Sequence, residues 1–332
     1  MITGASVNDQ PRVARGGNRE ELLELTHLVH RELLRRSETL PPSWVEESAE
    51  DLSAGRLAGW YYPIASHGGG LGFYSLRADR AYGHIHVAEG RTAASRIRRL
   101  LRTMLDSLPP SIRSFDTGLT GLGPPEEAGL VLDLRSEPGG TILERLGMLR
   151  DLTPADASTP PEPPAGLRYV GVRSVTLDAL TLLDWSAFQG TTDESLIGGK
   201  IEDNRRVLEG ILSNRLGRFL EEASTILIDG SHRPVAALLT AEQSARQAIY
   251  LDLIVDPTQR RRGLAAALSR WGFRALWALG YTSVRLWVTE ENLPARRLYE
   301  MLGFRPAVRA IIYRWSRAAS GREDSPQPQR SM

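Results

Sequence analysis

A proline-rich segment near the middle of the chain constrains the fold more than any other feature of the sequence. Five of the twelve residues from Thr153 to Pro164 are proline. Proline lacks the amide hydrogen that a helix interior or a central strand requires, and runs of it favour an extended connection. At 332 residues the chain also exceeds the usual length of one domain. The sequence therefore predicts two domains joined by a linker.

The predicted boundaries follow from this segment and from the polar ends of the chain. We expect, in order, a first domain at 18–150, the linker at 151–165, a second domain at 166–316 and a flexible tail at 317–332. Residues 1–17 are also rich in glycine and arginine and are expected to be frayed.

The overall composition excludes several classes of protein. The formal net charge is +1, too small to create a field that gathers nucleic acid or anionic lipid. Cysteine is absent, which excludes disulfides, thiolate metal sites and a cysteine nucleophile. No apolar run approaches the roughly 18 residues that span a bilayer. We expect a soluble, cytoplasmic monomer or homodimer with no metal, no nucleic acid and no membrane partner.

Hydrophobic periodicity in the second half predicts strands that first pair as a hairpin and then alternate with helices. Helices are expected at 175–188, 201–216, 264–279 and 294–302. Strands are expected at 224–228, 234–240, 249–255, 283–288 and 308–313. This order indicates the α/β class (mixed α+β), with a mixed, mostly antiparallel sheet flanked by helices.

The first half repeats this order more faintly. Helices are expected at 19–36, 93–108 and 141–148, and strands at 57–64, 70–76, 82–87 and 111–117. The helix at 141–148 echoes residues 297–304 of the second half, because both combine leucines with a closing Leu-Gly pair. The sequence thus predicts two tandem domains of related fold.

The most informative stretch, Val255–Ala266, joins a strand to a helix. Its sequence is Val-Asp-Pro-Thr-Gln-Arg-Arg-Arg-Gly-Leu-Ala-Ala. The unpaired amides of a helix N-terminus are donors suited to a pyrophosphate, and Gly263 and Ala265 let a ligand approach the main chain. Positive charge comes from Arg260, Arg261 and Arg262. The alternative is a basic turn before a surface helix, with its arginines solvated.

A second motif follows one strand later. Residues 292–304 read Asn-Leu-Pro-Ala-Arg-Arg-Leu-Tyr-Glu-Met-Leu-Gly-Phe. On a helix, Tyr299 lies on the apolar stripe, and Asn292 stands at the N-cap position. Taken alone, this motif is an ordinary capped helix whose tyrosine packs in the core.

Together the two motifs resemble the signatures of the GNAT superfamily of N-acetyltransferases. The first matches as Arg-x-x-Gly-x-Ala and the second as Asn-x-x-Ala-x-x-Leu-Tyr-x-x-x-Gly-Phe. The resemblance implies that acetyl-CoA binds with its pyrophosphate on the amides of residues 260–266 and its pantetheine along the preceding strand. The coenzyme-binding residues that it implies are Leu253, Ile254, Val255, Arg260, Arg261, Arg262, Gly263, Leu264, Ala265, Ala266, Asn292 and Tyr299.

The resemblance also implies that a neutral amine attacks the thioester directly. Such a reaction needs donors for the oxyanion, a base for the amine and an acid for the leaving thiolate. Tyr299 resembles the family's general acid, and the amides around Ile254 and Val255 would serve the oxyanion. Asp252 lies on the strand that leads into the loop and is the first candidate for the base, although it could instead pair with an arginine. The other candidates for the base are Glu194, Glu290 and Glu291.

The first half lacks these features. Its counterpart of the loop, Val87–Ser95, has no Arg-x-x-Gly spacing and places Glu89 where an anion would bind. His84 and His86 are a pair without a third ligand, which favours a structural role. A solvated helix face is expected for Arg96, Arg98, Arg99 and Arg102. The first domain is therefore expected to be a degenerate, non-catalytic copy.

The expected function is transfer of an acetyl group from acetyl-CoA to a primary amine, of a small molecule, in a ternary complex. A tandem arrangement with the intact copy second also resembles the mycothiol synthases, so acetylation of an amino-thiol conjugate is an alternative. Two further alternatives are acetylation of a protein and an acyl-CoA sensor without turnover. An intact Tyr299 argues against the sensor, because a sensor needs no acid for a leaving group.

Overall fold

A computed structural model describes residues 10–317, apart from short segments at 36–43, 65–68, 89, 91, 121–123, 158–161 and 195–199. The predicted tail from residue 318 onward and the middle of the predicted linker lie outside the described residues. The chain divides into two compact units. Unit 1 comprises residues 1–26, 46–142 and 312–332, and unit 2 comprises residues 27–45 and 143–311. Unit 2 thus takes in residues 143–151, upstream of the proline-rich segment.

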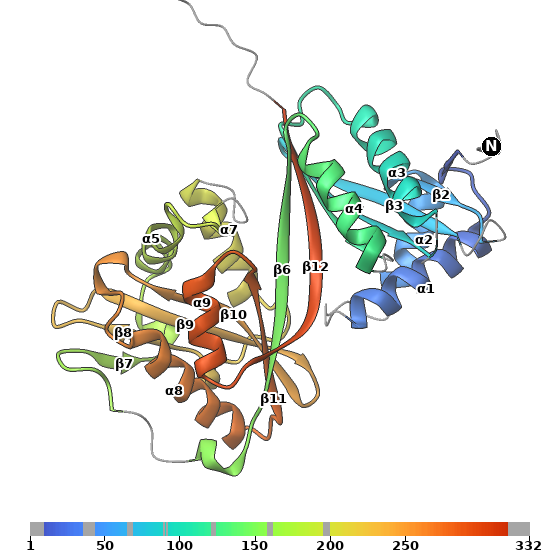
Figure 1. Cartoon of the computed structure of the whole chain (residues 1–332). Coiled ribbons are helices and arrows are strands. Elements are labelled where there is room, and N and C mark those ends of the chain that lie inside the picture. Colours follow the sequence, from blue (N-terminus) through green and yellow to red (C-terminus); the bar gives the residue numbers. More distant parts are fainter. Residues whose placement is uncertain are drawn as a thin grey trace, which may run out of the picture. The chain divides into compact units, whose positions relative to one another are not determined.

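Unit 1 is built on an antiparallel meander that ends in one parallel pair. Strand order within it is β1-β2-β3-β4-β5, with β4 and β5 parallel. Helix α3 packs on β3 and β4 through an apolar stripe (Figure 1). The elements are β1 (Arg12–Val13), α1 (Arg19–Arg35), α2 (Trp44–Ala54), β2 (Ala58–Tyr62), β3 (Gly70–Arg77), β4 (Arg80–Val87), α3 (Ala93–Ser107), β5 (Ser114–Thr120) and α4 (Pro124–Arg135), although residues 27–35 of α1 and 44–45 of α2 belong to unit 2.

Unit 2 holds a larger mixed sheet. Strand order is β12-β6-β11-β10-β9-β8-β7, and the pairs from β6 to β7 are antiparallel except for β10 with β11. The elements are β6 (Gly140–Asp151), β7 (Arg168–Val170), α5 (Leu177–Phe188), α7 (Ile201–Leu212), β8 (Thr225–Ile228), β9 (Pro234–Ser244), β10 (Gln247–Val255), α8 (Leu264–Ala278), β11 (Ser283–Thr289), α9 (Leu293–Met301) and β12 (Arg305–Ser316), although residues 140–142 of β6 and 312–316 of β12 belong to unit 1. The mixed, mostly antiparallel sheet confirms the predicted fold class.

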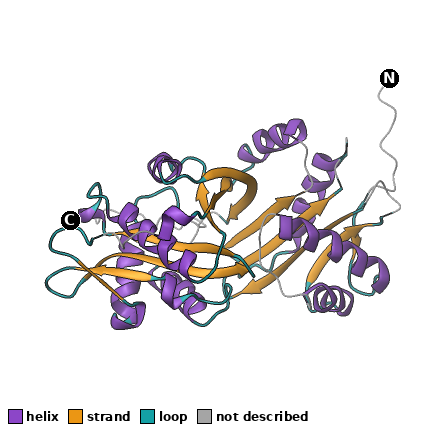
Figure 2. Cartoon of the chain, turned by 90° about the horizontal axis from the view of Figure 1, so that it is seen from below, coloured by secondary structure: helices purple, strands orange, loops and turns teal. Residues whose placement is uncertain are grey.

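Helices cover both faces of the sheet in unit 2. Leu238 of β9 lies in a core cluster with Leu268 of α8, whereas the next residue, Leu239, lies in a second cluster with Leu183 of α5. Successive side chains of a strand point to opposite faces, so α8 packs on one face and α5 with α7 on the other. Figure 2 shows helices on either side of the strands.

Residues 141–148, which were predicted to form a helix, form the middle of strand β6. This strand pairs antiparallel with β11, from Asp151 opposite Ser283 to Arg145 opposite Thr289. A short apolar run does not by itself distinguish a buried strand from a helix, and here the pairing partner decides. The predicted echo of residues 297–304 is therefore wrong. Two helices, α2 and α4, were not predicted at all.

The expected solvated face of α3 is also only partly correct. Arg98 and Arg102 lie at the surface and pair with Asp133 and Glu137. Arg96, however, is only 2% exposed, and its guanidinium carbon lies 4.6 Å from the centre of the Tyr62 ring. Arg96 precedes the buried Leu100 by one helical turn, which places it on the apolar stripe.

Arg150 of β6 connects three parts of unit 2. Its Nε donates to the Leu302 carbonyl at the end of α9 (2.8 Å), and its two terminal nitrogens donate to the Asp156 carboxylate (3.1 and 2.8 Å). The guanidinium also lies 3.9 Å from the centre of the Phe273 ring of α8. The start of the predicted linker is therefore held against the sheet as a short 3₁₀ turn, Pro154–Ala157.

We predict that Arg150→Gln lowers the free energy of unfolding of the protein by about 3 kcal/mol, because it leaves the Asp156 charge with little compensation in a site that is only 10% exposed. Urea denaturation followed by tryptophan fluorescence measures the change. Arg173→Gln is the matched control, since the Arg173–Glu221 pair is 70% and 42% exposed and should contribute no more than about 1 kcal/mol. Equal effects of the two substitutions would contradict the anchoring role of Arg150.

Candidate functional site

The site begins where strand β10 loses one of its two neighbours. The parallel Cα pairs between β10 and β11 run from Gln247–Ser283 to Tyr250–Leu286 and do not extend to Leu251–Val255. On its other side β10 stays paired with β9 to its last residue. The second half of β10 therefore presents one unpaired main-chain edge, and this edge contains the predicted residues Leu253, Ile254 and Val255.

The register of β10 is also irregular at the start of this edge. The pairing with β9 shifts between Tyr250 and Asp252, which leaves Leu251 without a partner on β9. Such a bulge re-aims main-chain groups and occurs often beside active sites. The irregularity lies three residues before Ile254, where the sequence placed the oxyanion donors.

The corresponding strands of unit 1 show the opposite arrangement. Strand β4 pairs with β5 over the whole length of β5, from Arg80–Ser114 to His86–Thr120. His84 Nε2 and His86 Nδ1 both hydrogen-bond the Thr120 hydroxyl, at 3.1 and 2.9 Å. No unpaired edge is left at this position, and the two histidines join the strands as the structural interpretation expected.

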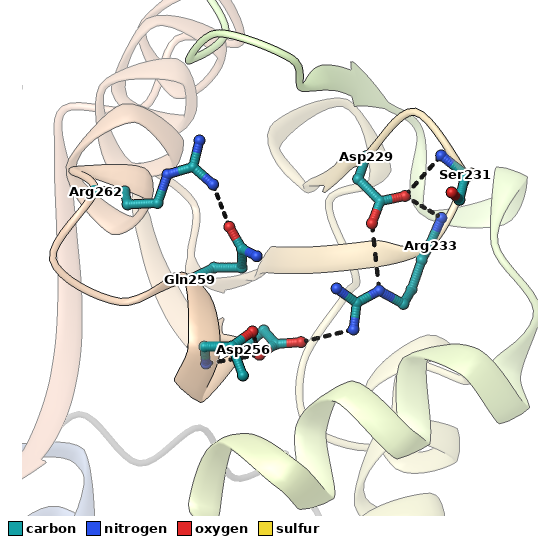
Figure 3. Close-up of polar contacts among 7 residues, drawn as sticks. Asp229, Ser231, Arg233, Asp256, Gln259 and Arg262 are labelled. Carbon is teal, nitrogen blue, oxygen red and sulfur yellow. Dashed lines mark hydrogen bonds and ion pairs between the residues drawn. The ribbon is translucent and has the colours of Figure 1, made fainter.

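The carboxylate of Asp256 stabilises the loop after β10. It accepts hydrogen bonds from the Thr258 amide (2.8 Å), the Thr258 hydroxyl (2.6 Å) and Arg233 Nη1 (3.2 Å). Arg233 also bonds Asp229, so the β8–β9 hairpin supports the loop (Figure 3). Although burial alone would raise the pKa of Asp256, Thr258 and Arg233 hold it below its usual range.

The turn into α8 leaves its amides open. Arg261 and Gly263 both have a left-handed backbone, with φ of +65° and +76°, and residues 260–263 are exposed. Helix α8 has no side-chain cap. No amide from Arg260 to Ala266 donates to any residue in the described part of the chain. The turn therefore offers unpaired main-chain donors at the surface, where the pyrophosphate was predicted to bind.

The arginines of this turn are partly engaged with the protein. Arg260 Nη2 donates to the Ala187 carbonyl at the end of α5 (2.6 Å), and Arg262 bonds the Gln259 side chain. An anion at this turn would thus meet the main-chain amides first, with the guanidinium groups close by. This arrangement suits a pyrophosphate.

Asp193 gathers polar groups from three elements near the N-terminus of α9. It accepts hydrogen bonds from Arg145 of β6 (3.3 Å), from the Thr289 hydroxyl of β11 and from Asn292 Nδ2 (2.8 Å). Asn292 also caps α9, because its Oδ1 accepts from the Ala295 amide (3.2 Å). Both ends of the Asn292 side chain are therefore engaged within the protein.

Tyr299 lies on α9 beside this cluster. Its ring contacts Phe304, with centroids 5.8 Å apart, and its hydroxyl has no hydrogen-bond partner among the described residues. The pKa of Tyr299 is raised by burial first and then by the negative charges of Asp252 and Asp193, whereas Arg145 acts in the opposite direction. The structure thus brings Tyr299 and Asp252, two predicted catalytic residues, into one electrostatic environment.

Asp252 does not pair with an arginine, which was the alternative to a catalytic role. It is only 9% exposed, and in the described part of the chain its charged neighbour is a second carboxyl group, Asp184 of α5. Burial and this neighbour raise the pKa of Asp252 well above the ordinary value of aspartate. The other proposed bases are engaged elsewhere: Glu194 accepts from the Gly190 amide (2.9 Å), and Glu290 pairs with Arg309 (2.9 Å).

Three residues of this site were not identified from the sequence. Arg145 was hidden because its segment was taken for a helix of the first domain. Asp193 and Asp184 carry no motif, and only the tertiary fold brings them to β10 and α9. Within the described ranges, no group of three or more His, Cys, Asp and Glu side chains is placed to hold a metal ion. Nor does any helix of those ranges have the length and hydropathy needed to cross a bilayer.

Comparison with known proteins agrees with this geometry. Residues 194–304 match the family model described as Acetyltransferase (GNAT) family. A mycothiol acetyltransferase from Thermobispora bispora is 32% identical over 114 residues, which cover 34% of this chain and 38% of that protein. A mycothiol acetyltransferase from Clavibacter michiganensis subsp. michiganensis is 28% identical over 152 residues, 46% of each chain. The matched segments thus span less than half the length of these curated relatives.

The fold is shared with solved structures of acetyltransferases. The GCN5-related N-acetyltransferase from Sphaerobacter thermophilus aligns with a TM-score of 0.59 at 16% identity, over 91% of this chain and 94% of that one. A tandem GNAT protein from the clavulanic acid biosynthesis pathway gives a TM-score of 0.55 at 16% identity, over 94% and 99%. At such identity the likeness concerns the fold, and it confirms the predicted tandem arrangement.

We predict opposite effects of the same substitution at two glycines of unit 2. Gly263→Ala should lower the free energy of unfolding by roughly 1 kcal/mol, because its φ of +76° disfavours a residue with a Cβ, although no atom lies within 4 Å of that Cβ. Gly210→Ala, inside α7, should raise it by roughly 0.5–1 kcal/mol, because its Cβ would meet atoms only at 3.9 Å or beyond. Chemical denaturation measures both. Destabilisation of equal size at the two positions would argue against the left-handed turn.

Proposed function

Because unit 2 carries a GNAT acetyltransferase domain, we propose that this unit transfers an acetyl group from acetyl-CoA to a primary amine. The proposal rests on two features of unit 2 that adjoin each other along the chain. The unpaired edge of β10 leads directly into the uncapped N-terminus of α8. An extended pantetheine arm suits the first feature, and a pyrophosphate suits the second.

In this proposal the amides of residues 260–266 hold the pyrophosphate, and the β10 edge from Leu253 to Val255 binds the pantetheine arm. Asn292 and Tyr299 complete the coenzyme site. Most of the catalytic domain is residues 166–316, as the linker position suggested, together with strand β6. Unit 1 serves as a non-catalytic copy, and the full pairing of β4 with β5 supports this role.

The chemistry of the proposal follows from the charges around Tyr299. The amine attacks the thioester carbonyl, main-chain donors at the β10 irregularity stabilise the oxyanion, and Tyr299 protonates the leaving thiolate. Burial keeps the Tyr299 proton in place until a stronger base forms beside it. Arg145 favours the tyrosinate that results, because its positive charge opposes the rise in the Tyr299 pKa. Asp252 is the proposed base.

The acceptor is proposed to be an amine of a small molecule. The names of the curated relatives favour a narrower candidate, namely the amine that a mycothiol acetyltransferase acetylates. Two acidic side chains, Asp193 and Asp252, lie close enough to Tyr299 to raise its pKa, and Asp184 lies next to Asp252. They favour an acceptor that arrives with a positive charge.

We predict that the protein releases coenzyme A from acetyl-CoA in the presence of a suitable primary amine, and that Tyr299→Phe lowers kcat about 100-fold because the thiolate loses its acid. Release of free thiol across a panel of amines, including amino-thiol conjugates, measures both. Tyr169→Phe is the matched control, because Tyr169 stacks on Trp271, and its kcat should be unchanged.

Two outcomes would overturn this assignment. Unchanged turnover in Tyr299→Phe would remove Tyr299 as the acid. Calorimetric binding of acetyl-CoA without turnover on any amine of the panel would favour the sensor over the enzyme.

A further inference from the structure

Two carboxyl groups meet inside unit 2, one on α5 and one on β10. Asp184 is completely buried and Asp252 is 9% exposed. Helix α5 packs on β9 and β10, and the two carboxyl groups lie close enough together for each to affect the pKa of the other. Neither residue forms an ion pair with Arg, Lys or His anywhere in the described ranges. The pair therefore has no cation to compensate its charge.

One buried oxygen of Asp184 lacks a hydrogen-bond donor, and a proton at this contact would supply it. Asn204 Nδ2 donates to Asp184 Oδ2 at 2.8 Å. Asp184 Oδ1 is sealed from solvent, and no N–H or O–H group of a described residue donates to it. An ionised carboxylate only accepts hydrogen bonds, so two ionised groups cannot bond each other. One shared proton satisfies Asp184 Oδ1 and halves the buried charge.

The groups around the pair distinguish its two members. Asn204 of α7 closes the Asp184 side, and its amide holds Asp184 in place. On the Asp252 side lies Tyr299 of α9, followed by Asp193 and then Arg145 of β6. Asp252 is therefore the member of the pair that faces the proposed reaction, and Asp184 is the member behind it.

We propose that Asp184 and Asp252 act as one acid–base unit that takes up a single proton from the incoming amine, with Asp252 as the catalytic residue and Asp184 as its positioning residue. The inference rests on the proposed acetyl transfer. A lone carboxylate, with a pKa near 4, is a weak base toward an ammonium group with a pKa near 10. A buried pair without a proton is a far stronger base, because the proton relieves the repulsion of two charges.

The proton balance of the reaction closes with one proton released to solvent. The pair first loses its shared proton, and an incoming ammonium then gives one proton to Asp252, where it is shared with Asp184. The neutral amine nitrogen bonds the acetyl carbon, the carbon–sulfur bond breaks, and the thiolate takes the Tyr299 proton. The second nitrogen proton passes to the Tyr299 oxygen, and the pair releases its own proton to solvent before the next amine binds. One ammonium thus yields one amide, one thiol and one released proton, and no oxidant or reductant is needed.

The first test is the pH dependence of kcat at saturating amine. Wild type should gain activity through an apparent pKa well above the ordinary aspartate value, since burial and Asp184 raise the pKa of Asp252. Asp184→Asn removes one of the two charges, so the rise of kcat with pH should move to lower pH by about one unit or more. Asp252→Asn should lose about 100-fold in kcat. If kcat of Asp184→Asn rises at the same pH as kcat of the wild type, the proposal is overturned.

The second test does not depend on turnover. With aspartate labelled by ¹³C in its carboxyl group, infrared spectroscopy should show one protonated carboxyl at neutral pH. That band should vanish in Asp184→Asn and in Asp252→Asn. It should persist in Asp193→Asn, the matched control, because Asp193 pairs with Arg145. Absence of the band in wild type, or its persistence in both dyad variants, overturns the shared proton. A band without acetyl transfer would refute the proposed enzyme and leave the shared proton standing.

Discussion

The parallel pairing between β10 and β11 stops at Tyr250 and Leu286, and the rest of the site depends on that stop. Beyond it, β10 is fixed by β9 alone, so its free edge, its bulge and the loop that follows are available to a ligand. In unit 1 the equivalent pairing continues to the last residue of the shorter strand. The same arrangement of strands thus leaves an unpaired main-chain edge in one unit and a paired strand in the other.

Electrostatics in unit 2 divide into two zones with different physical characters. Around the turn before α8, unpaired amides and exposed arginines create a positive surface near the solvent. Around Tyr299, the carboxyl groups of Asp193 and Asp252 and the largely buried Arg145 lie where water screens them weakly. A long ligand with an anionic end and a neutral reactive end would meet each zone with the matching end.

The sequence predicted the parts of this site that act locally. The glycine at 263 and the spacing around it encode a turn and a helix start, and Asn292 encodes a cap, so short windows were sufficient. The parts that failed depend on partners far away in the chain. Residues 141–148 became a strand because β11 pairs with them, and Arg96 became buried because the helical register places it on the apolar stripe. The role of Asp184 depends on its neighbour Asp252 in β10, which lies far from α5 in the sequence.

Strand β6 supplies both Arg145, which faces Tyr299, and Arg150, which holds the end of α9. It does so from a position before the proline-rich segment, and its neighbour β11 comes more than a hundred residues later. The proline-rich segment is therefore not a clean domain boundary. A polypeptide that began at residue 166 would retain both motifs and yet lack β6, which lies between β12 and β11 in the sheet. Recombination or truncation at the prolines would therefore separate the two motifs from Arg145 and Arg150.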